Sequence, residues 1–506
     1  MRAASSDCRR DGYARRRPEE TLLYQIVQAH FPAVRERAEE HGGLPKFVTR
    51  EFEEYLRCGI LSEGCLHLVC RACGHEHVVG LSCKRRGFCP SCLGRRMADS
   101  AVHLERSVLP AVAVRHWICS LPWGLRALLG YDRVLAANVA NAFATELSRS
   151  LKKKAKAALK LRSVSDAHTG SVLAVQRTDS ALRLNVHFHV LALDGVYVRD
   201  KASDGLVFQP LGTPTRAEVA NIAARTAARI EKILKKAGRS LDAEMPEQPP
   251  ELCDKEPGLA ACYGAAAQGG CVSGDRAGLP PLRLIATGDP KLPTDDPSDP
   301  VAEVRGVNLH ARQVVDGRDR RRLERLARYI CRPPIAQERL TLRPDGTLEL
   351  ELKSTWKDGT RAFVFCPEDL VLRLVAAIPP PRWHMLRYFG ILSSHCRLRK
   401  EVVPRPAADP TAFGPPPAAG DQLELRFEDL SDGEPPRRNR WAWLLAHVFR
   451  VDVETCERCG GPMRWVDVAT TRRSAARLLA ELGLGPQPPP EPKPIAFGQL
   501  ALPFRK

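Results

Sequence analysis

The hydrophobic and polar positions of the chain follow two periods that alternate along its length. The strongest strand pattern is at residues 184–193 (LNVHFHVLAL), which end in the turn dipeptide Asp194-Gly195. Further strand patterns occur at 114–121, 171–176, 347–353 and 361–365. Helical periodicity occurs at 22–27, 49–57, 95–109, 131–161, 219–234, 319–331 and 369–377. The mixture predicts an α+β protein with an antiparallel sheet flanked by helices.

Shifts in composition divide the chain into predicted regions. A helical, cysteine-containing module at 20–110 precedes the main domain at 111–402. Within that domain, residues 239–303 are rich in Pro, Gly and Asp and predict a flexible insertion with a short helix near 259–267. The remaining predicted regions are a linker at 403–438, a small unit with a CxxC pair at 439–485 and a disordered tail at 486–506.

The charge balance favours a polyanionic partner. The 506 residues include 77 Lys+Arg and 59 Asp+Glu, a formal net charge of +18. Basic residues cluster at 149–162, where Lys152, Lys153 and Lys154 are candidate DNA contacts. No stretch approaches the roughly 20 apolar residues of a membrane span, so no membrane partner is expected. The start of the chain has no secretory pattern, and we expect a cytoplasmic, nucleoid-associated protein.

The cysteines predict metal binding in place of disulfides. The chain has 17, an odd number, and many stand in CxxC pairs. Two pairs are separated by fifteen residues, and four thiolates at this spacing can hold one structural Zn²⁺. The predicted ligands are Cys70, Cys73, Cys89 and Cys92. Lys84, Arg85 and Arg86 lie between the pairs and are candidate DNA contacts.

Other cysteines leave alternatives open. Cys83 stands six residues before Cys89 and is an alternative fourth ligand. Cys58 and Cys65 are interpreted as packing residues. Cys456 and Cys459 form one more CxxC pair, but no matching pair follows it, so a site there would need outside ligands such as His447 or another chain.

His187 and His189 form the second chemical signal. Residues i and i+2 of a strand face the same side, so both imidazoles project together while the apolar residues between and around them face the opposite layer. Such a pair can bind a divalent ion, although two buried core histidines are the alternative. Gln176, at the end of the preceding strand, is a candidate third ligand, and this ligand set suits Mg²⁺ or Mn²⁺.

Tyr329 is a candidate nucleophile in the 319–331 helix. Arg322, Arg325 and Arg332 fall on the same helical face and could bind a phosphodiester. Taken alone, this pattern also fits a surface tyrosine beside a solvated basic stripe. Together with a histidine-bound metal and a zinc module, it predicts attack on DNA with formation of a covalent phosphotyrosine.

The chain resembles transposases of the IS91 family, within the HUH endonuclease superfamily. The resemblance extends over about 20–402, with a weaker match at 436–485. The stretches that carry it are 83–92 (CKRRGFCPSC), 120–122 (SLP), 184–195, 326–333 (LARYICRP) and 379–390 (PPPRWHMLRYFG).

The resemblance implies an HUH-type antiparallel sheet, with His187 and His189 as the metal-binding pair and Tyr329 as the nucleophile. The tyrosine would cleave single-stranded or hairpin DNA at the ends of a mobile element, become linked to the 5′ phosphate and leave a free 3′-OH. Transposition would use rolling-circle-like intermediates. Some members have a second tyrosine four residues earlier; here Arg325 occupies that position, which resembles the single-tyrosine branch of common-region elements.

Three other functions compete with this interpretation. A zinc-containing DNA-binding regulator would need neither the histidine pair nor an arginine-flanked tyrosine. An inactive transposase remnant would retain the same residues without activity. A water-activating zinc deaminase would have HxE and a downstream PCxxC, whereas this chain has His189 and an upstream pair at 89–92.

Overall fold

The computed structural model describes residues 17–242, 250–272, 276–286, 296, 298–404, 455–485, 487, 490 and 491. Its contacts divide the chain into two compact units. Among the described residues, the larger unit contains mainly 18–58 and 82–403, and the smaller contains 59–81 and 455–485. Residues 59–81 are thus grouped with the C-terminal segment and not with the rest of the predicted 20–110 module. The predicted linker at 403–438 and most of the tail at 486–506 lie outside the described residues.

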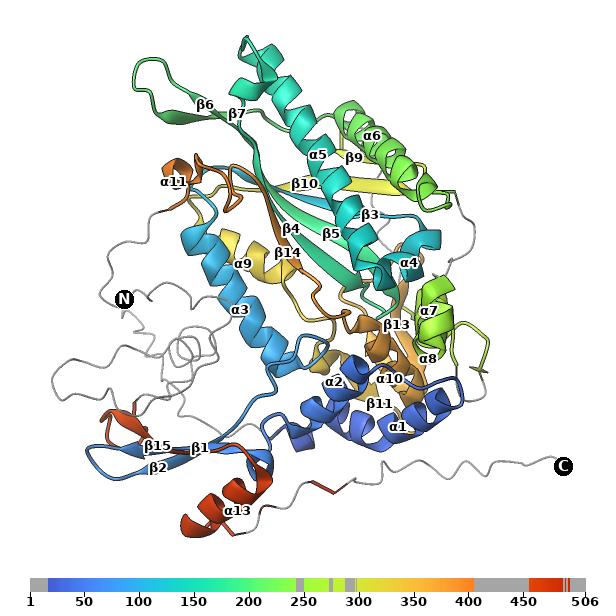
Figure 1. Ribbon diagram of the computed structural model, residues 1–506, viewed down its shortest axis with the longest axis vertical. Helices are drawn as coiled ribbons and strands as arrows, with labels where there is room; N and C mark the ends of the chain where they lie inside the picture. Colours follow the sequence, from blue (N-terminus) through green and yellow to red (C-terminus); the bar gives the residue numbers. More distant parts are fainter. Residues whose placement is uncertain are drawn as a thin grey trace, which may run out of the picture. The chain divides into compact units, whose positions relative to one another are not determined.

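A six-stranded antiparallel sheet forms the centre of the larger unit (Figure 1). Its order is β14-β4-β5-β3-β10-β9, and the strand with the two histidines, β5, lies between β4 and β3. The strands are β3 (Val114–Ser120), β4 (Gly170–Thr178), β5 (Leu184–Leu193), β9 (Val301–Val304), β10 (Val307–Val315) and β14 (Leu386–Gly390). The predicted antiparallel sheet with flanking helices is confirmed.

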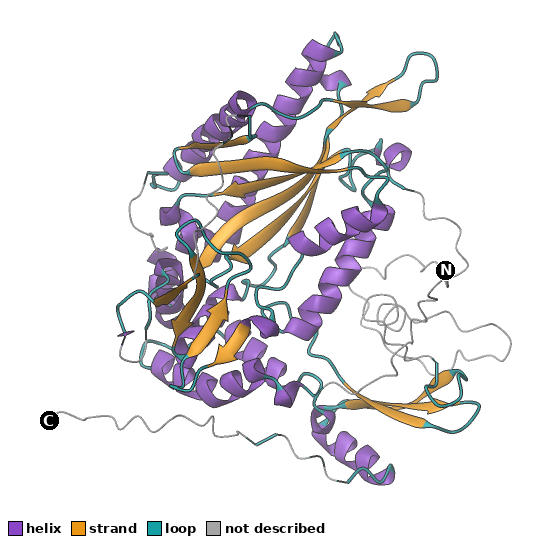
Figure 2. Ribbon diagram, turned by 180° about the vertical axis from the view of Figure 1, so that it is seen from behind, coloured by secondary structure: helices purple, strands orange, loops and turns teal. Residues whose placement is uncertain are grey.

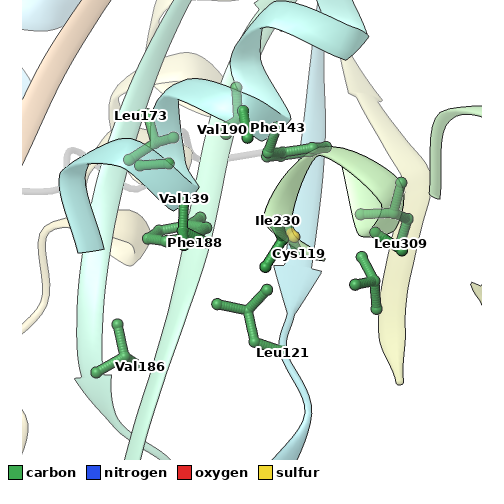
Figure 3. Close-up of a cluster of buried hydrophobic side chains, with 14 of the residues drawn as sticks. Cys119, Leu121, Val139, Phe143, Leu173, Val186, Phe188, Val190, Ile230 and Leu309 are labelled. Atoms are coloured by element: carbon green, nitrogen blue, oxygen red, sulfur yellow. The ribbon is translucent and has the colours of Figure 1, made fainter. Parts of the chain in front are cut away.

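One face of this sheet is covered by two helices, α5 (Arg133–Ala158) and α6 (Arg216–Lys235). Figure 3 shows Val186, Phe188 and Val190 of β5 among the residues of this hydrophobic cluster. Phe188 is completely buried, and removing such a side chain from water contributes about 1.5–3 kcal/mol to stability. The alternation predicted for this strand therefore places its apolar residues on one face and leaves the histidines for the other.

The opposite face is covered by α3 (Pro90–Ser107) and α9 (Arg320–Ile330). Helix α9 begins after Asp319, whose side chain accepts a hydrogen bond from the backbone N–H of Arg322. Leu323, Leu326 and Ile330 form its buried stripe, at helical spacing. The helix ends at Ile330, three residues before the Pro333-Pro334 pair, because proline cannot continue a helix.

The larger unit also contains a second, four-stranded antiparallel sheet of order β11-β12-β13-β8, seen in Figure 2. Its strands are β8 (Leu282–Ile285), β11 (Leu340–Leu342), β12 (Leu348–Glu351) and β13 (Thr360–Phe365). The other helices of this unit are α1 (Leu22–Glu39), α2 (Lys46–Arg57), α4 (Arg126–Tyr131), α7 (Pro250–Lys255), α8 (Pro257–Gln268), α10 (Pro367–Ala377) and α11 (Arg399–Val402). The larger unit also contains a hairpin formed by β6 (Gly195–Arg199) and β7 (Leu206–Pro210).

The predicted flexible insertion at 239–303 needs correction in its described parts. Helix α8 buries Leu259 and Tyr263 completely, and β8 pairs with β13. The Arg177 guanidinium donates to the Tyr263 hydroxyl at 3.0 Å, which ties α8 to the central sheet. The short helix predicted near 259–267 is present as α8. The abundance of Pro and Gly concealed β8 and its pairing with β13, because composition reports local chain preference and not long-range pairing.

The described residues of the smaller unit form a three-stranded antiparallel sheet of order β15-β1-β2 and the α-helix α13. Its elements are β1 (Cys65–Cys70), β2 (Glu76–Gly80), β15 (Met463–Ala469) and α13 (Arg472–Glu481). Its main hydrophobic cluster contains Leu61, Cys65, Ala469, Ala475, Leu478 and Leu479. Across the described parts of both units, no helix has the length and apolar character that crossing a membrane requires.

Candidate active site and cysteine clusters

His187 and His189 project from the same face of β5, as their spacing predicts. Their ring centroids are 5.1 Å apart, and both side chains are buried. The Nδ1 of His187 lies 2.7 Å from the carbonyl oxygen of Asn185. A carbonyl can only accept, so Nδ1 carries the proton and Nε2 has a free lone pair. The hydrogen bond to the Asn185 carbonyl holds the ring in one orientation and leaves Nε2 available to a metal ion.

A third imidazole, His116 on β3, adjoins the pair. Its Nε2 lies 2.9 Å from Nδ1 of His189, and the two rings stack with centroids 5.1 Å apart. On its other side, His116 Nδ1 lies 3.3 Å from the amide oxygen of Gln313 on β10. That oxygen accepts, so His116 donates through Nδ1 and accepts from His189 through Nε2.

This chain of hydrogen bonds leaves Nε2 of His189 without a proton. The atom is buried and has no hydrogen-bond partner among the residues that the structure describes. A buried nitrogen lone pair without a partner is costly unless something absent from the protein alone satisfies it. The Nε2 atoms of His187 and His189 thus both have lone pairs that could bind a divalent ion.

Burial keeps all three imidazoles neutral. It lowers the pKa of His116 to about 4 and also lowers the pKa of His187. Burial, with the neighbouring His187 and His116, lowers the pKa of His189 well below its ordinary value. Neutral imidazoles are the protonation state that can bind metal ions.

Tyr329 lies in the last turn of α9, next to these rings. Its ring centroid is 5.6 Å from that of His189 and 5.9 Å from that of His116, edge-on in both cases. The tyrosine is 42% exposed while the imidazoles are buried, so a large substrate can reach it. The guanidinium carbon of Arg332 lies 4.2 Å from the centroid of its ring.

Gln176 lies on β4, next to the histidine strand β5, and forms hydrogen bonds with the end of the tyrosine helix α9. It is paired in register with His187. Its amide nitrogen donates to the carbonyl oxygens of Ile330 at 3.1 Å and of Tyr329 at 3.4 Å. The residue proposed as third ligand thus holds the C-terminal end of α9, where backbone carbonyls lack helical partners.

The predicted DNA contacts fall into separate groups. Near the tyrosine, Arg322 and Arg325 are exposed and Arg332 is half-buried. At 84–86, Lys84 and Arg86 are exposed, but Arg85 pairs with Glu54 at 3.4 Å. The third group lies on α5, on the sheet face opposite the histidines, and does not join this site.

A basic hollow of about 570 Å³ lies beside α5. Lys152 and Lys153 line it together with Arg149 and Arg225. Lys154 does not: its ammonium group binds Glu218 at 3.0 Å. A separate cavity of about 300 Å³ lies beside the tyrosine helix, and the residues that line it include Arg86, Arg96, Gln176, Arg332 and Lys353.

The structure corrects the predicted grouping of the cysteines. Cys70 and Cys73 do not meet Cys89 and Cys92; each pair belongs to its own group of four. The first group, in the larger unit, is Cys58, Cys83, Cys89 and Cys92. The second group, in the smaller unit, is Cys70, Cys73, Cys456 and Cys459. Cys58, interpreted as a packing residue, and Cys83, the alternative ligand, complete the first group.

The sulfur atoms of the first group have the spacing of a tetrahedral site. The Cys83–Cys92 distance is 3.4 Å, and the Cys58–Cys92 and Cys58–Cys89 distances are both 3.7 Å. Four sulfurs at about 2.3 Å from Zn²⁺ lie about 3.8 Å from one another. Arg95 donates to the Cys92 sulfur at 3.6 Å, a contact that suits a thiolate.

Two family models match the chain. One, described as "Putative transposase", matches residues 170–400, which include the histidine pair, Gln176 and Tyr329. The other, described as the transposase zinc-binding domain of the IS91 type, matches residues 26–121. No curated protein and no solved structure gives a significant match. The zinc-binding match and the groups of four cysteines together support structural zinc.

Proposed function

The chain belongs to the IS91 family of transposases, and from this premise we propose that it cuts and rejoins single-stranded DNA at the ends of a mobile element through a covalent 5′-phosphotyrosine. The observation that carries the proposal is the position of Tyr329, an exposed phenol edge-on to the buried ring of His189 at 5.6 Å. An HUH-type arrangement, with the histidine pair on an inner strand and the tyrosine on a helix, is consistent with this geometry.

Tyr329 is the proposed nucleophile. Its hydroxyl oxygen attacks phosphorus, a new O–P bond forms and the bond from phosphorus to the 3′ oxygen breaks. The phenolic proton passes to solvent, and the leaving oxygen takes a proton to become a free 3′-OH. A 3′-OH of another strand reverses the step, releasing the tyrosine and rejoining the DNA. Because Arg325 stands four residues earlier, only one tyrosine on this helix is available.

His187 and His189 would hold a divalent ion, Mg²⁺ or Mn²⁺, through their Nε2 atoms, with Gln176 as the candidate third ligand. When bound, such an ion supplies a positive charge that polarises the phosphodiester. The protein's own part is orientation. Asn185 fixes the tautomer of His187, and His116 fixes that of His189.

The basic side chains would hold the DNA strand. Arg322 and Arg325 are exposed on the tyrosine helix, and Arg332 stacks on the tyrosine ring. Lys84 and Arg86 extend this basic surface, with Arg86 lining the cavity beside the helix. Guanidinium groups suit this role because they bind phosphate oxygens in a bidentate manner.

Lys152 and Lys153, with Arg149, would contact a more distant part of the DNA, because they lie in the layer on the other side of the sheet. Lys154 and Arg85 are engaged in ion pairs with Glu218 and Glu54, so we expect smaller contributions from them. Element ends with hairpin structure are the expected substrate, because their single-stranded loops expose the phosphodiester.

The test is adduct formation on a labelled single-stranded oligonucleotide that carries the element end, with Mn²⁺ present. We expect a covalent adduct with the wild-type protein and none with Tyr329→Phe. The matched control is Tyr388→Phe on β14, a partly buried tyrosine of the hydrophobic cluster, which should retain the adduct. Tight DNA binding without any adduct in the wild type would favour a non-catalytic regulator or an inactive remnant.

A further inference from the structure

We propose that Cys70, Cys73, Cys456 and Cys459 bind a second structural zinc ion, which fastens the C-terminal segment to the β1–β2 hairpin. The two pairs are more than 380 residues apart in the sequence. The zinc-binding family model ends at residue 121, so Cys456 and Cys459 lie outside it. The proposal does not depend on the catalytic assignment.

The sulfur positions fit a tetrahedral ion. The Cys70–Cys459 distance is 3.5 Å and the Cys73–Cys456 distance is 3.7 Å, and all four sulfurs lie within 4.8 Å of one another. These contacts cross between the two pairs, as the edges of one tetrahedron do. They approach the separation of about 3.8 Å that four zinc-bound thiolates adopt.

Each pair lies on the same kind of turn. Gly74 donates its N–H to the carbonyl of Cys70 at 3.0 Å, and Gly460 donates to Cys456 at 2.8 Å. Both glycines have positive φ, 70° and 73°, a conformation that other residues adopt only with strain. The sequence CxxCG therefore produces two matching metal-binding knuckles, Cys-Arg-Ala-Cys-Gly and Cys-Glu-Arg-Cys-Gly.

The backbone approaches the sulfurs closely at Gly461. Its N–H points to the sulfur of Cys459 at 3.4 Å, a contact that stabilises a thiolate. A Cβ added at this position would lie 3.2 Å from the sulfurs of both Cys459 and Cys70 and 2.7 Å from the Cβ of Ala72. Only glycine leaves the space that both knuckles need.

Strand register brings the knuckles together. β15 pairs antiparallel with β1 from Cys65↔Ala469 to Cys70↔Met463, so the end of β1 meets the start of β15. Among the residues described for the smaller unit, two small hydrophobic clusters are available to maintain this pairing. Folds with so small a core commonly need a metal or a disulfide, and zinc binding then contributes directly to folding.

Zinc content measured on the purified full-length protein tests the proposal. We expect two ions per chain in the wild type, one for each group of four cysteines. The double variant Cys456→Ser/Cys459→Ser should retain one, and so should Cys70→Ser/Cys73→Ser. The quadruple variant of these four residues should also retain one, because both pairs serve the same ion. The control Cys253→Ser/Cys396→Ser should retain both.

Three results would overturn the proposal: one ion per wild-type chain, an unchanged zinc content in Cys456→Ser/Cys459→Ser, or loss of both ions from that variant. Either of the first two results would mean that Cys456 and Cys459 do not share a zinc ion with Cys70 and Cys73. The third would mean that the two groups do not bind zinc independently.

A second measurement tests whether the zinc ion holds the C-terminal segment on the β1–β2 hairpin. A protease site inserted between residues 405 and 454 allows the full-length protein to be cut after folding. The fragment that contains 455–485 should remain bound to the tagged N-terminal part while zinc is present. It should separate when a strong chelator removes the zinc. Release of the fragment with zinc still bound would contradict the proposal.

Discussion

The Nε2 atom of His116 lies 2.9 Å from the Nδ1 atom of His189, and this contact determines which nitrogen of His189 is free. The free Nε2 is buried without a partner among the described residues and lies on the ring that Tyr329 approaches edge-on. His116 therefore acts on the candidate metal site through another residue. This geometry and its surroundings lead to five predictions, and the last concerns the proposed chemistry itself.

Replacing His116 should weaken metal binding. His116→Phe removes the acceptor of the His189 N–H, and loss of such a supporting contact typically lowers metal affinity about 10- to 100-fold. Titration with Mn²⁺ measures the affinity. His116→Gln keeps an acceptor in the side chain and should restore most of the binding.

The control for this experiment is His310→Gln, on the neighbouring strand β10, where the imidazole is half-buried. It should leave the Mn²⁺ affinity unchanged. If His116→Phe binds Mn²⁺ as tightly as the wild type, the supporting role of His116 is wrong.

Acid should destabilise the metal-free protein through the buried histidines. The pKa of His116 is about 4 in the folded state and about 6.5 in an unfolded chain. Between these values the unfolded chain binds more protons, so the free energy of unfolding falls as the pH drops from about 6.5 to about 4. For His116 alone, this pKa difference lowers the free energy of unfolding by roughly 3 kcal/mol below about pH 4 and has no effect at pH 8.

Chemical denaturation of wild type and His116→Gln, at pH 8 and at pH 4.5, measures this effect. The variant should lose less stability between the two pH values than the wild type. An equal loss in both proteins would mean that His116 is protonated equally in the folded and unfolded states.

Gln176→Leu should destabilise the end of the tyrosine helix. The variant removes the amide donor from the carbonyls of Tyr329 and Ile330, and unsatisfied buried acceptors cost about 1–3 kcal/mol. Denaturation measures this loss, and adduct formation should slow because the tyrosine is held less firmly. Gln209→Leu, at a half-buried position of β7, is the control and should change neither. Unchanged stability and rate in Gln176→Leu would contradict the positioning role.

The variant Gln176→Glu distinguishes two roles of Gln176, which are holding the end of the tyrosine helix and binding the divalent ion. Glutamate keeps an oxygen that could bind the ion but cannot donate to the helix carbonyls. If Gln176 also serves as the third ligand, this variant should bind Mn²⁺ at least as tightly as the wild type while its adduct forms more slowly. Equal loss of Mn²⁺ affinity in Gln176→Glu and Gln176→Leu would remove Gln176 from the ligand set.

The sequence predicted the parts of the site that depend on local periodicity. Alternation in 184–193 was sufficient to place His187 and His189 on one face and Phe188 on the other, because a strand has a period of two. Helical spacing was sufficient to place Leu323, Leu326 and Ile330 on one stripe of α9. In both cases neighbouring residues contain the necessary information.

The sequence did not predict the parts that depend on register between distant segments. His116 was missed because its strand carries a single histidine, and only the pairing of β3 with β5 brings that histidine to His189. The cysteine grouping failed for the same reason, because spacing favours partners close in the chain whereas strand pairing selects Cys456 for Cys73. The repeated CxxCG was the one signal that could have linked those two pairs.

The most direct test of the account is to locate the covalent bond in the wild-type protein. The protein is incubated with the single-stranded element end and Mn²⁺, digested with protease and nuclease, and the nucleotide-bearing peptide is sequenced by mass spectrometry. We expect a 5′-phosphate bonded to Tyr329, in the peptide that contains LARYICRP. A nucleotide bonded to any other residue, or DNA cleaved with no protein-bound phosphate, would contradict the central claim.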